Sequence, residues 1–472
     1  MLDIALFREK PDWVREQLAK LNDPTALARV DAVVDIDKRR RAMIQEAEAL
    51  QATRNRLNKA FGQLRGSRTL SSAQVAARAV GAAEALEVAD YVRAEAILSG
   101  AQAVDDAQDA NPEAALARMN DAMRVLSERH AQLSAQADAA DDDLRREMLW
   151  IPNLPHESVP VGPDDSHNVP WPVEGAMPSF DFTPKPHWEL GVDLDIIDFE
   201  RGVRLAGSRF YVLKGWGARL QRALATFFLD MARQKGFVEL YLPFLVYDDM
   251  LEGAGQFPKF TDVVYSDPDA DLYLLPTAEV AITNLHRDEI LDEAQLPLYY
   301  VAQTPCFRRE KTSAGRDVRG IKRVHQFEKV EMYKFTTPET SYAELESLVE
   351  AACDIARALE IPHRRLEIVT GDLGFSASKK YDVEMWAAGS QEWLEVSSCS
   401  NTEAFQARRA MIRYYPKDSK KAQYVHTLNG SGLALPRVII AILENYQQAD
   451  GSVVIPSVLR PYLGGETIIR KP

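Results

Sequence analysis

A seven-residue repeat of hydrophobic residues near the N-terminus is the feature that most restricts how this chain can fold. One heptad position is filled by aliphatic residues: Ile36, Met43, Leu50, Leu57 and Leu64. The partner position is filled by Val33, Ala47 and Phe61, with Arg40 and Arg54 as polar interruptions. A sustained repeat of this period keeps a hydrophobic seam on one side of a long helix, so residues 33–64 are predicted to form one half of a coiled coil.

A second long helix is predicted after position 111. Asn111, Pro112 and Glu113 supply a cap, a proline at the first helical position and an acid in the first turn, which together indicate a helix start. The residues that then recur at alternating spacings of three and four are Leu116, Met119, Met123, Leu126, His130, Leu133, Ala137, Ala140 and Leu144. Two long seams in one chain predict an antiparallel hairpin, although the repeat alone equally allows a dimerisation coil or a plain structural helix pair.

Charge is unevenly distributed along this hairpin. The chain carries a net charge of −14, so a nucleic-acid partner has to be met by a local basic surface. From position 54 to 68 the charged residues are all basic: Arg54, Arg56, Lys59, Arg65 and Arg68. Such a cluster on a long rigid arm is suited to binding a phosphate backbone.

The alanine-rich acidic stretch at about 67–110 has no assigned function, and one or two extra helices are predicted there from Val75, Ala79, Leu86 and Val92.

The chain divides into an arm, a linker and a larger body. We expect a helical arm over residues 1–149 with its insert at about 67–110, a linker over 150–180 and a catalytic body over 181–472, because prolines without any periodicity follow Trp150.

The three cysteines, Cys306, Cys353 and Cys399, have no metal-site or C-x-x-C spacing, so neither a disulfide framework nor a zinc site is indicated. Without a hydrophobic run of roughly 20 residues or a basic N-terminal leader, the chain is expected to be cytoplasmic and not to cross a membrane.

Two strand-like segments in the body carry a mixture of charges and one ring. The first segment ends at Glu310, and the second begins near Lys322. Since alternate residues of a strand share a face, Arg308 and Glu310 are expected on one face of the first strand, and Arg323, Phe327 and Glu331 on one face of the second. Arginine, carboxylate and aromatic groups on one surface suit a nucleotide site. The alternative is the solvent-exposed face of an amphipathic hairpin, and spacing alone leaves it open.

Farther upstream in the body, a helix and a short strand are predicted. Leu220, Leu224, Phe227, Phe228 and Met231 form the hydrophobic side of a helix that Gly236 can end. The hydrophobic run at 238–246 contains Pro243, which favours an edge strand or an interface.

At these residues the sequence resembles the seryl-tRNA synthetase family of class II aminoacyl-tRNA synthetases. The segments that resemble the three class II motifs are 236–243, then FRRE at 307–310 with VHQFEKVE at 324–331, and NGSGLALPR at 429–437 with AILEN at 441–445. The segments that narrow the match to serine are TAE at 277–279, GAGQFPKF at 253–260, EVSSCSN at 395–401, FQARR at 405–409 and the helical arm.

The resemblance implies a fold, a reaction and a set of partners. The fold is α+β, with an antiparallel-sheet class II catalytic domain and an N-terminal antiparallel two-helix coiled-coil arm. The reaction has two steps: serine attacks the α-phosphate of ATP to give seryl-adenylate, and the 3′-terminal adenosine of tRNA(Ser) then takes the seryl group. The implied partners are ATP with Mg²⁺, L-serine, tRNA(Ser) and a second copy of the chain that pairs through residues 220–246, and tRNA(Sec) stays open as a further substrate.

The resemblance also assigns the nucleotide site. Arg308 would hold the α-phosphate, Glu310 the adenine amine, and Phe327 and Arg437 the two faces of the adenine ring. The remaining ATP-binding positions are Arg309, Glu395, Val396, Ser397 and Ser398, of which Glu395 and Ser398 would also hold Mg²⁺. Because strict alternation puts Glu395 and Ser398 on opposite faces, a bulge is expected between them. Arg309 and Pro436 depart from the usual family pattern, which leaves the local geometry at Pro436 open.

Serine and tRNA contacts complete the implied site. The serine pocket would be formed by Thr277, Ala278, Glu279, Glu331 and Ser431, with Glu331 reading the hydroxyl. The catalytic residues so implied are Arg308, Glu331 and Arg437, and the tRNA-binding residues are Arg54, Arg56, Lys59, Arg65 and Arg316. One rival is a synthetase-like ligase that loads an amino acid onto a carrier protein, but such relatives lack the long arm. A second rival, an inactive coiled-coil homologue, is disfavoured because Arg308, Glu331, Glu395 and Arg437 are all present.

Overall fold

The computed structural model describes residues 1–105, 111–311 and 319–471, which form two compact units. One unit comprises Met1–Ala28 together with residues 149–471, and the other is Arg29–Met148. Among the described residues, none of the helices is long and apolar enough to cross a membrane. The predicted residue Arg316 lies outside the described residues.

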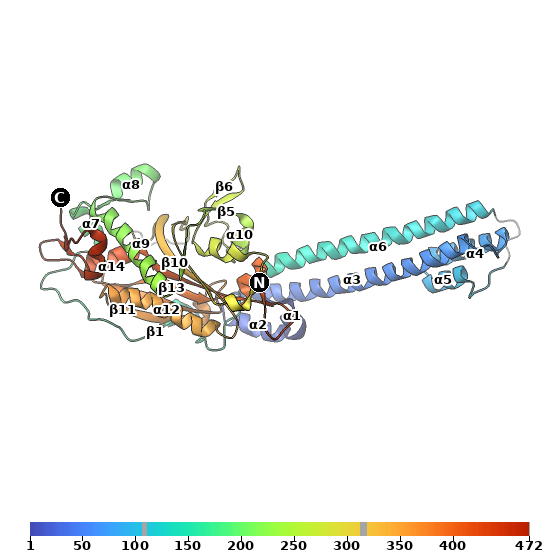
Figure 1. Ribbon diagram of the computed structural model, residues 1–472, viewed down its shortest axis with the longest axis horizontal. Coiled ribbons are helices and arrows are strands. Elements are labelled where there is room, and N and C mark those ends of the chain that lie inside the picture. Colours follow the sequence, from blue (N-terminus) through green and yellow to red (C-terminus); the bar gives the residue numbers. More distant parts are fainter. Residues whose placement is uncertain (106–110, 312–318, 472) are drawn as a thin grey trace. The chain divides into compact units, whose positions relative to one another are not determined.

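The Arg29–Met148 unit contains the two long helices predicted for the arm, which run side by side (Figure 1). Its helices are α3 (Pro24–Arg65), α4 (Ser72–Glu87), α5 (Tyr91–Ser99) and α6 (Pro112–Leu149). The helix start at Asn111 is confirmed, since its side chain accepts a hydrogen bond of 2.9 Å from the Glu113 N–H. The seam is confirmed as well: Leu57 and Leu64 of α3 and Met119 and Leu133 of α6 are buried in one hydrophobic cluster.

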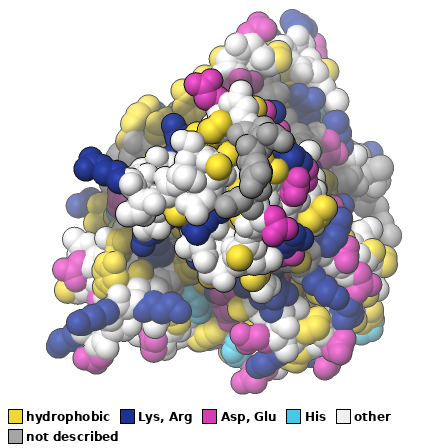
Figure 2. Space-filling model, turned by 90° about the vertical axis from the view of Figure 1, so that its right-hand side faces the viewer, with side chains coloured by type: hydrophobic (Ala, Val, Ile, Leu, Met, Phe, Trp, Pro, Cys, Tyr) yellow, Lys and Arg dark blue, Asp and Glu magenta, His cyan; other side chains and the backbone are white. Residues whose placement is uncertain are grey.

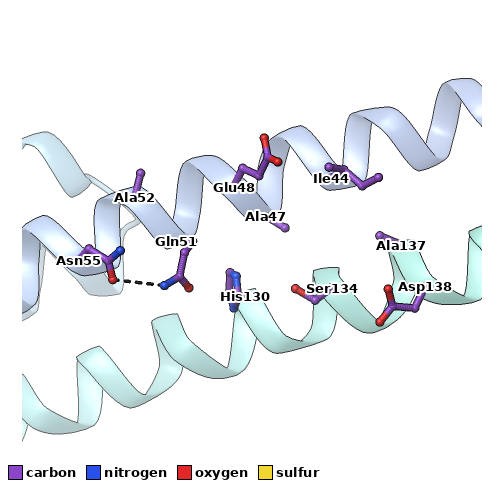
Figure 3. Close-up of a pocket in the computed structure, with 10 residues that line it drawn as sticks. All are labelled: Ile44, Ala47, Glu48, Gln51, Ala52, Asn55, His130, Ser134, Ala137 and Asp138. Atoms are coloured by element: carbon purple, nitrogen blue, oxygen red, sulfur yellow. Dashed lines mark hydrogen bonds between the residues drawn. The ribbon is translucent and has the colours of Figure 1, made fainter. Parts of the chain in front are cut away.

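The described part of the insert forms two helices, and both contribute to the core of the arm. Ala79 and Leu86 of α4 and Ile97 of α5 are buried in the same cluster as the seam of α3 and α6. The predicted extra helices are therefore present, and Val92 lies on the solvent side of α5, where its side chain is 80% exposed. A groove between α3 and α6 is lined by ten residues, among them Ala47, Gln51, His130, Ser134 and Ala137 (Figure 3).

The larger unit is organised around a sheet of eight strands in the order β1-β11-β12-β13-β16-β10-β9-β4. All neighbouring pairs are antiparallel except β4 with β9. The strands are β1 (Val169–Pro170), β4 (Val238–Leu240), β9 (Leu298–Phe307), β10 (Gln326–Thr336), β11 (His363–Glu367), β12 (Lys379–Ala387), β13 (Glu392–Asn401) and β16 (His426–Ala434). This antiparallel-dominated sheet, with the helical hairpin, gives the α+β class that was expected.

Long helices cover one face of the sheet. They are α9 (Trp216–Gln234), α12 (Ser341–Ala358) and α14 (Leu435–Asn445) (Figure 1). Val330 and Met332 of β10 pack into the core with them, whereas Tyr333 and Phe335 pack into a separate cluster with Ala278 and Ala407. Since side chains alternate along β10, the odd-numbered residues face away from these helices, toward the short helices and loops of the other side.

Smaller elements complete this unit. Its other helices are α1 (Ile4–Glu9), α2 (Pro11–Ala19), α7 (His187–Asp193), α8 (Phe199–Ala206), α10 (Asp248–Gly253), α11 (Glu279–Thr283) and α13 (Phe405–Ala410). Its other strands are β2 (Ile197–Asp198), β3 (Val212–Leu213), β5 (Leu245–Tyr247), β6 (Ser266–Asp267), β7 (Leu272–Leu274), β8 (Ile290–Asp292), β14 (Arg413–Tyr415), β15 (Gln423–Tyr424), β17 (Val453–Val454) and β18 (Ile468–Ile469).

The region around Pro243 is an edge, as predicted, although it is not one strand. β4 is the terminal strand of the large sheet, while β5 pairs with β7 in a separate sheet. Pro243 lies between the two strands, where its missing N–H interrupts no ladder. The preceding helix ends as expected, with Gly236 in a left-handed conformation at φ +89°.

Candidate active site

Strand pairing brings the predicted serine-pocket residues together. Glu331 of β10 lies directly opposite Ser431 of β16, and the register of this pair shifts between Lys329 and Glu331. Thr277 and Ala278 are buried just before α11, and the Thr277 hydroxyl donates a hydrogen bond of 3.1 Å to Oε2 of Glu331. Side chains from three separate segments therefore meet on the odd-numbered face of β10.

Glu331 is fully buried and shares one of its oxygens with two donors. Lys329 Nζ forms an ion pair with Oε2 of Glu331 and donates a hydrogen bond of 2.8 Å to the Thr277 hydroxyl. Oε1 of Glu331 has no hydrogen-bond partner among the described residues. A buried carboxylate oxygen without a partner is a strong acceptor for a hydroxyl or ammonium group. The sequence reasoning gave Lys329 no role, although its position two residues before Glu331 on a strand puts it on the same face.

Glu279 is a second buried carboxylate beside this pocket. Gln406 Nε2 donates a hydrogen bond of 2.7 Å to its Oε1, and Asn429 Nδ2 donates one of 3.3 Å to its Oε2. Burial raises the pKa of Glu279 to about 7, and the negative charge of Glu331 adds to this shift. The Glu279 carboxyl group therefore changes its charge near neutral pH.

The two strands at the nucleotide side are shorter than predicted. β9 ends at Phe307 and β10 begins at Gln326, so the expectation that Arg308, Glu310 and Arg323 lie on strands is wrong. One further bond to the partner segment follows, from the Arg308 N–H to the His325 carbonyl at 2.9 Å, while the Arg309 N–H points the other way and donates to the Val263 carbonyl at 2.9 Å. Glu310 then adopts a left-handed conformation with φ +45°, which strand alternation cannot predict.

Four of the side chains predicted on this nucleotide surface are nevertheless close to each other in two pairs. The Arg308 guanidinium is 5.3 Å from the ring centroid of Phe327, and its Nε donates a hydrogen bond of 3.1 Å to the Pro276 carbonyl. The Glu310 carboxylate is 3.8 Å from the Arg323 guanidinium. Arg309 turns elsewhere, with its guanidinium 5.0 Å from the ring centroid of Tyr265. Cations, a carboxylate and a ring thus flank the loop that follows β9.

The bulge expected near Glu395 is present. On β12 and β13, Val383 pairs with Ser397 and the next residue, Glu384, pairs with Glu395, which leaves Val396 as the extra residue. Val396 and Ser397 are buried, while Glu395 and Ser398 are not. The bulge therefore turns the predicted ligand pair Glu395 and Ser398 toward the same open side of the sheet.

Arg437 and Glu395 form the other edge of this site. Arg437 lies in the first turn of α14, and its Nη1 donates to the Glu395 carbonyl and is 3.6 Å from the carboxylate. Desolvation raises the pKa of Glu395, but the positive charges of Arg437, Lys380 and other nearby cations outweigh it and hold the pKa below its ordinary value. Pro436 also lies in the first turn of α14, where a missing N–H removes no helical bond.

Asp382 is a further residue of this site that the sequence reasoning missed. It lies on β12 directly opposite Ser398, and its Oδ1 is buried with no partner among the described residues. Burial raises the pKa of Asp382 to about 7, with Lys380 opposing the shift and Glu395 adding to it. Glu395, Ser398 and Asp382 offer only hard oxygen ligands, which fit Mg²⁺ held jointly with phosphate groups. Among the described residues, no cluster of three or more histidine, cysteine, aspartate or glutamate side chains forms a protein-only metal cage.

The predicted tRNA-binding residues that can be described lie on α3 of the arm. Arg56 is paired with Glu95 of α5 at 2.9 Å, which the sequence did not indicate. Lys59 and Arg65 are exposed, and Arg54 is half-buried. In the space-filling view, lysine and arginine side chains are interspersed with aspartate and glutamate and do not form a surface of one sign (Figure 2).

Known proteins share this architecture along the whole chain. The family described as "Seryl-tRNA synthetase N-terminal domain" matches residues 1–89, and the family "tRNA synthetase class II core domain (G, H, P, S and T)" matches residues 260–446. The serine–tRNA ligase of Roseiflexus sp. (strain RS-1) is 53% identical over 472 residues, covering 100% of both chains. That of Thermomicrobium roseum is 50% identical, covering 100% of this chain and 96% of the relative.

Solved structures agree with these sequence matches. The seryl-tRNA synthetase of Pyrococcus horikoshii complexed with ATP is 34% identical, with a TM-score of 0.85 and coverage of 100% of both chains. The cytoplasmic serine–tRNA ligase of Naegleria fowleri in complex with AMP is 28% identical, with a TM-score of 0.84 over 100% of this chain. Because identity above one half extends over the full length, this chain belongs to the seryl-tRNA synthetase family of class II aminoacyl-tRNA synthetases.

Proposed function

We propose that the protein is a serine–tRNA ligase that activates L-serine with ATP and transfers it to tRNA(Ser). In the first step the serine carboxylate attacks the α-phosphate, which forms seryl-adenylate and releases diphosphate. In the second step a hydroxyl of the terminal adenosine attacks the seryl carbonyl, which forms the ester and releases AMP. The observation that carries the proposal is the buried Glu331 carboxylate, which lies opposite Ser431 and beside Thr277 with one oxygen unpartnered.

Recognition of serine would depend on polar groups that are costly to leave unpaired. Glu331 would accept a hydrogen bond from the substrate hydroxyl, with Thr277, Ala278, Glu279 and Ser431 forming the rest of the pocket. Alanine has no hydroxyl, so its binding would leave the buried oxygen of Glu331 without a partner, at a cost of about 1–3 kcal/mol or more for a charged group. The pocket would therefore select serine by the penalty that it imposes on smaller amino acids.

ATP would be held by charge and stacking, without covalent chemistry from the protein. Arg308 would neutralise the α-phosphate, Glu310 would accept from the adenine amine, and Phe327 and Arg437 would cover the ring. The other positions of this site would be Arg309, Glu395, Val396, Ser397 and Ser398. Mg²⁺ would be held by Glu395 and Ser398 and would supply charge neutralisation at the phosphates. Positioning and charge neutralisation of this kind are sufficient for adenylate formation.

The arm would bind tRNA through its basic residues. In this domain assignment residues 1–149 carry tRNA recognition, 150–180 form a linker and 181–472 carry the chemistry. Support comes from the compactness of Arg29–Met148 as a separate unit. Arg54, Arg56, Lys59 and Arg65 would contact phosphates, and Arg316 would contact tRNA from the body. Whether tRNA(Sec) is also charged would be decided by the same contacts.

A homodimer would form at the edge of the large sheet. β4 is a terminal strand of the sheet, and Val238 and the neighbouring Tyr241 are 56% and 90% exposed. An uncovered strand edge beside exposed large hydrophobic residues favours pairing with another chain.

A cytoplasmic location is part of the proposal, because the protein would act where tRNA is charged.

One experiment separates this function from that of a carrier-protein ligase. ATP–diphosphate exchange is measured with serine, alanine, threonine and glycine, and charging is then measured with tRNA(Ser) and with a candidate carrier protein. We expect exchange that depends on serine and charging of tRNA alone. Serine-dependent exchange without tRNA charging would support the rival ligase, and exchange driven best by alanine or glycine would reject the pocket assignment.

A further inference from the structure

Gln406 is a fully buried residue to which neither the sequence reasoning nor the proposed reaction gives a role. It lies on α13, in the FQARR segment, and comes close to residues of four other segments. Its Nε2 donates to Oε1 of Glu279 at 2.7 Å and to the Ala254 carbonyl at 3.0 Å. Its Oε1 accepts from the hydroxyls of Tyr333 at 2.8 Å and Thr427 at 2.7 Å. The amide group therefore has a partner on every side.

The chemistry of these partners determines which way the amide is oriented. The Ala254 carbonyl can only accept, so the side of Gln406 that faces it has to be the NH₂ group. That same NH₂ group then faces Glu279, and the carbonyl faces the two hydroxyls. Reversing the amide would place its oxygen against the Ala254 carbonyl and the Glu279 carboxylate, whereas the hydroxyls can serve either orientation. Gln406 is consequently held with an N–H aimed at Glu279.

The N–H of Gln406 donates a hydrogen bond to the Glu279 carboxyl group, whose burial favours its protonated, uncharged form. Burial raises the pKa of Glu279 to about 7, and Glu331 raises it further, while Lys329, Gln406 and Arg308 act in the opposite direction. Tyr333 is the other titratable group that faces it. A hydrogen bond donated to a carboxylate favours its ionised form, so removing the Gln406 donor shifts this balance toward the protonated form.

We propose that Gln406 is a positioning residue for serine recognition, which keeps Glu279 ionised and oriented toward the pocket that contains Thr277 and Glu331. This inference rests on the proposed function, because it takes that pocket to be the serine site. An ionised carboxylate there supplies negative charge for the α-ammonium group of the amino acid. Protonation of Glu279 removes that charge, so serine affinity depends on the Gln406 hydrogen bond.

The test is the pH profile of serine-dependent ATP–diphosphate exchange in a Gln406→Met variant. Methionine has a similar length and no donor. We expect the acidic limb of kcat/KM for serine to move upward by about one pH unit, which is about a tenfold loss at pH values below it. The loss should recover toward pH 8.5, and KM for ATP should stay unchanged, because Gln406 forms these hydrogen bonds with Glu279, Ala254, Tyr333 and Thr427 and with no residue assigned to ATP.

A matched control is Tyr333→Phe. This change removes a buried hydrogen bond to the same amide but leaves the bond from Gln406 to Glu279 intact. We expect a lower melting temperature and an unshifted pH profile. An equal shift in Tyr333→Phe, or an even loss of activity at all pH values in Gln406→Met, would show that Gln406 has only a structural role and would overturn the proposal.

A third variant guards against misfolding of Gln406→Met. Glu279→Gln preserves shape and can still accept from Gln406, but it cannot ionise. Its pH profile should lack the acidic limb, and persistence of that limb would overturn the proposal. If the wild-type protein shows no serine-dependent exchange, the proposed function fails. If it shows exchange while the Gln406→Met profile is unshifted, only this inference fails.

Discussion

Lys329 and Glu331 stand two residues apart on β10, and their side chains form an ion pair that is buried beside Thr277. The two residues share a face because side chains alternate along a strand. Burial of both charges is tolerated only because each neutralises the other. The pair therefore links the stability of the sheet to the charge of the candidate serine pocket.

Removing one member of this pair should be costly. In Lys329→Met the Glu331 carboxylate stays buried without its counter-charge, and we expect a loss of about 3–5 kcal/mol in the free energy of unfolding. The double variant Lys329→Met with Glu331→Gln should recover much of this loss, because no unpaired charge remains. Denaturant unfolding of wild type, both single variants and the double variant measures this coupling. Additive effects would contradict it.

Truncation of Glu331 should abolish recognition of serine while ATP binding persists. We expect Glu331→Ala to lower serine-dependent ATP–diphosphate exchange on the order of a hundredfold or more, because the substrate hydroxyl loses its charged acceptor. ATP binding, measured by calorimetry, should be unchanged. Unaltered serine turnover in this variant would reject the assignment of Glu331.

The ionisation of Glu279 should make stability depend on pH. Its pKa is raised from 4.5 to about 7 in the folded protein, so folding favours the protonated form. The stabilising contribution is then complete below pH 4.5 and is lost as the pH rises through about 7. Glu279→Gln should show a smaller decrease in the free energy of unfolding over this range. Parallel pH curves for wild type and variant would contradict the burial of an ionisable group.

The arm should contribute to tRNA charging and not to adenylate formation. Deleting residues 30–146 and joining the ends with a short linker should leave serine-dependent exchange largely intact and strongly reduce tRNA charging. Equal charging by both proteins at subsaturating tRNA would favour the carrier-protein ligase.

Neutralising Arg54, Arg56 and Lys59 should weaken tRNA binding and reduce the log–log salt slope by about one unit per lost phosphate contact. Arg56 is already paired with Glu95, so Glu95→Gln is the matched control and should strengthen tRNA binding. This control is preferable to deleting residues 69–109, because α4 and α5 share the hydrophobic cluster of the arm. Equal salt slopes in all three proteins would indicate that these residues form only a solvated helix face.

Disruption of the β4 edge should produce monomers. Tyr241→Asp places a charge at an exposed ring beside this strand, and light scattering at micromolar concentration should then report the mass of one chain instead of two. Val161→Asp is a control, because Val161 is 74% exposed and belongs neither to β4 nor to the segment that follows it. A dimeric mass for Tyr241→Asp would move the interface elsewhere.

Much of the fold could be predicted from residues that are close together in the sequence. The seam of α3, the cap at Asn111, the left-handed end at Gly236 and the edge position of Pro243 all follow from local geometry. Such features depend on the period of a helix or strand and on what proline and glycine permit, and these properties act over a few residues. The bulge near Val396 could also be expected, since two ligands of one site have to share a face.

The chemistry of the candidate pocket was decided by contacts between distant parts of the chain. Gln406 meets Glu279 across 127 positions, and Arg56 meets Glu95 across 39. Beyond β9, the Arg309 N–H donates to the carbonyl of Val263, a residue 46 positions away that no local pattern indicates. The family, most helices and strands, and most of the candidate residues could be predicted from the sequence alone. Which of these residues meet, and how they are charged, follows from the tertiary packing, because hydrogen-bond partners and desolvation depend on which segments pack together, and no local periodicity encodes that packing.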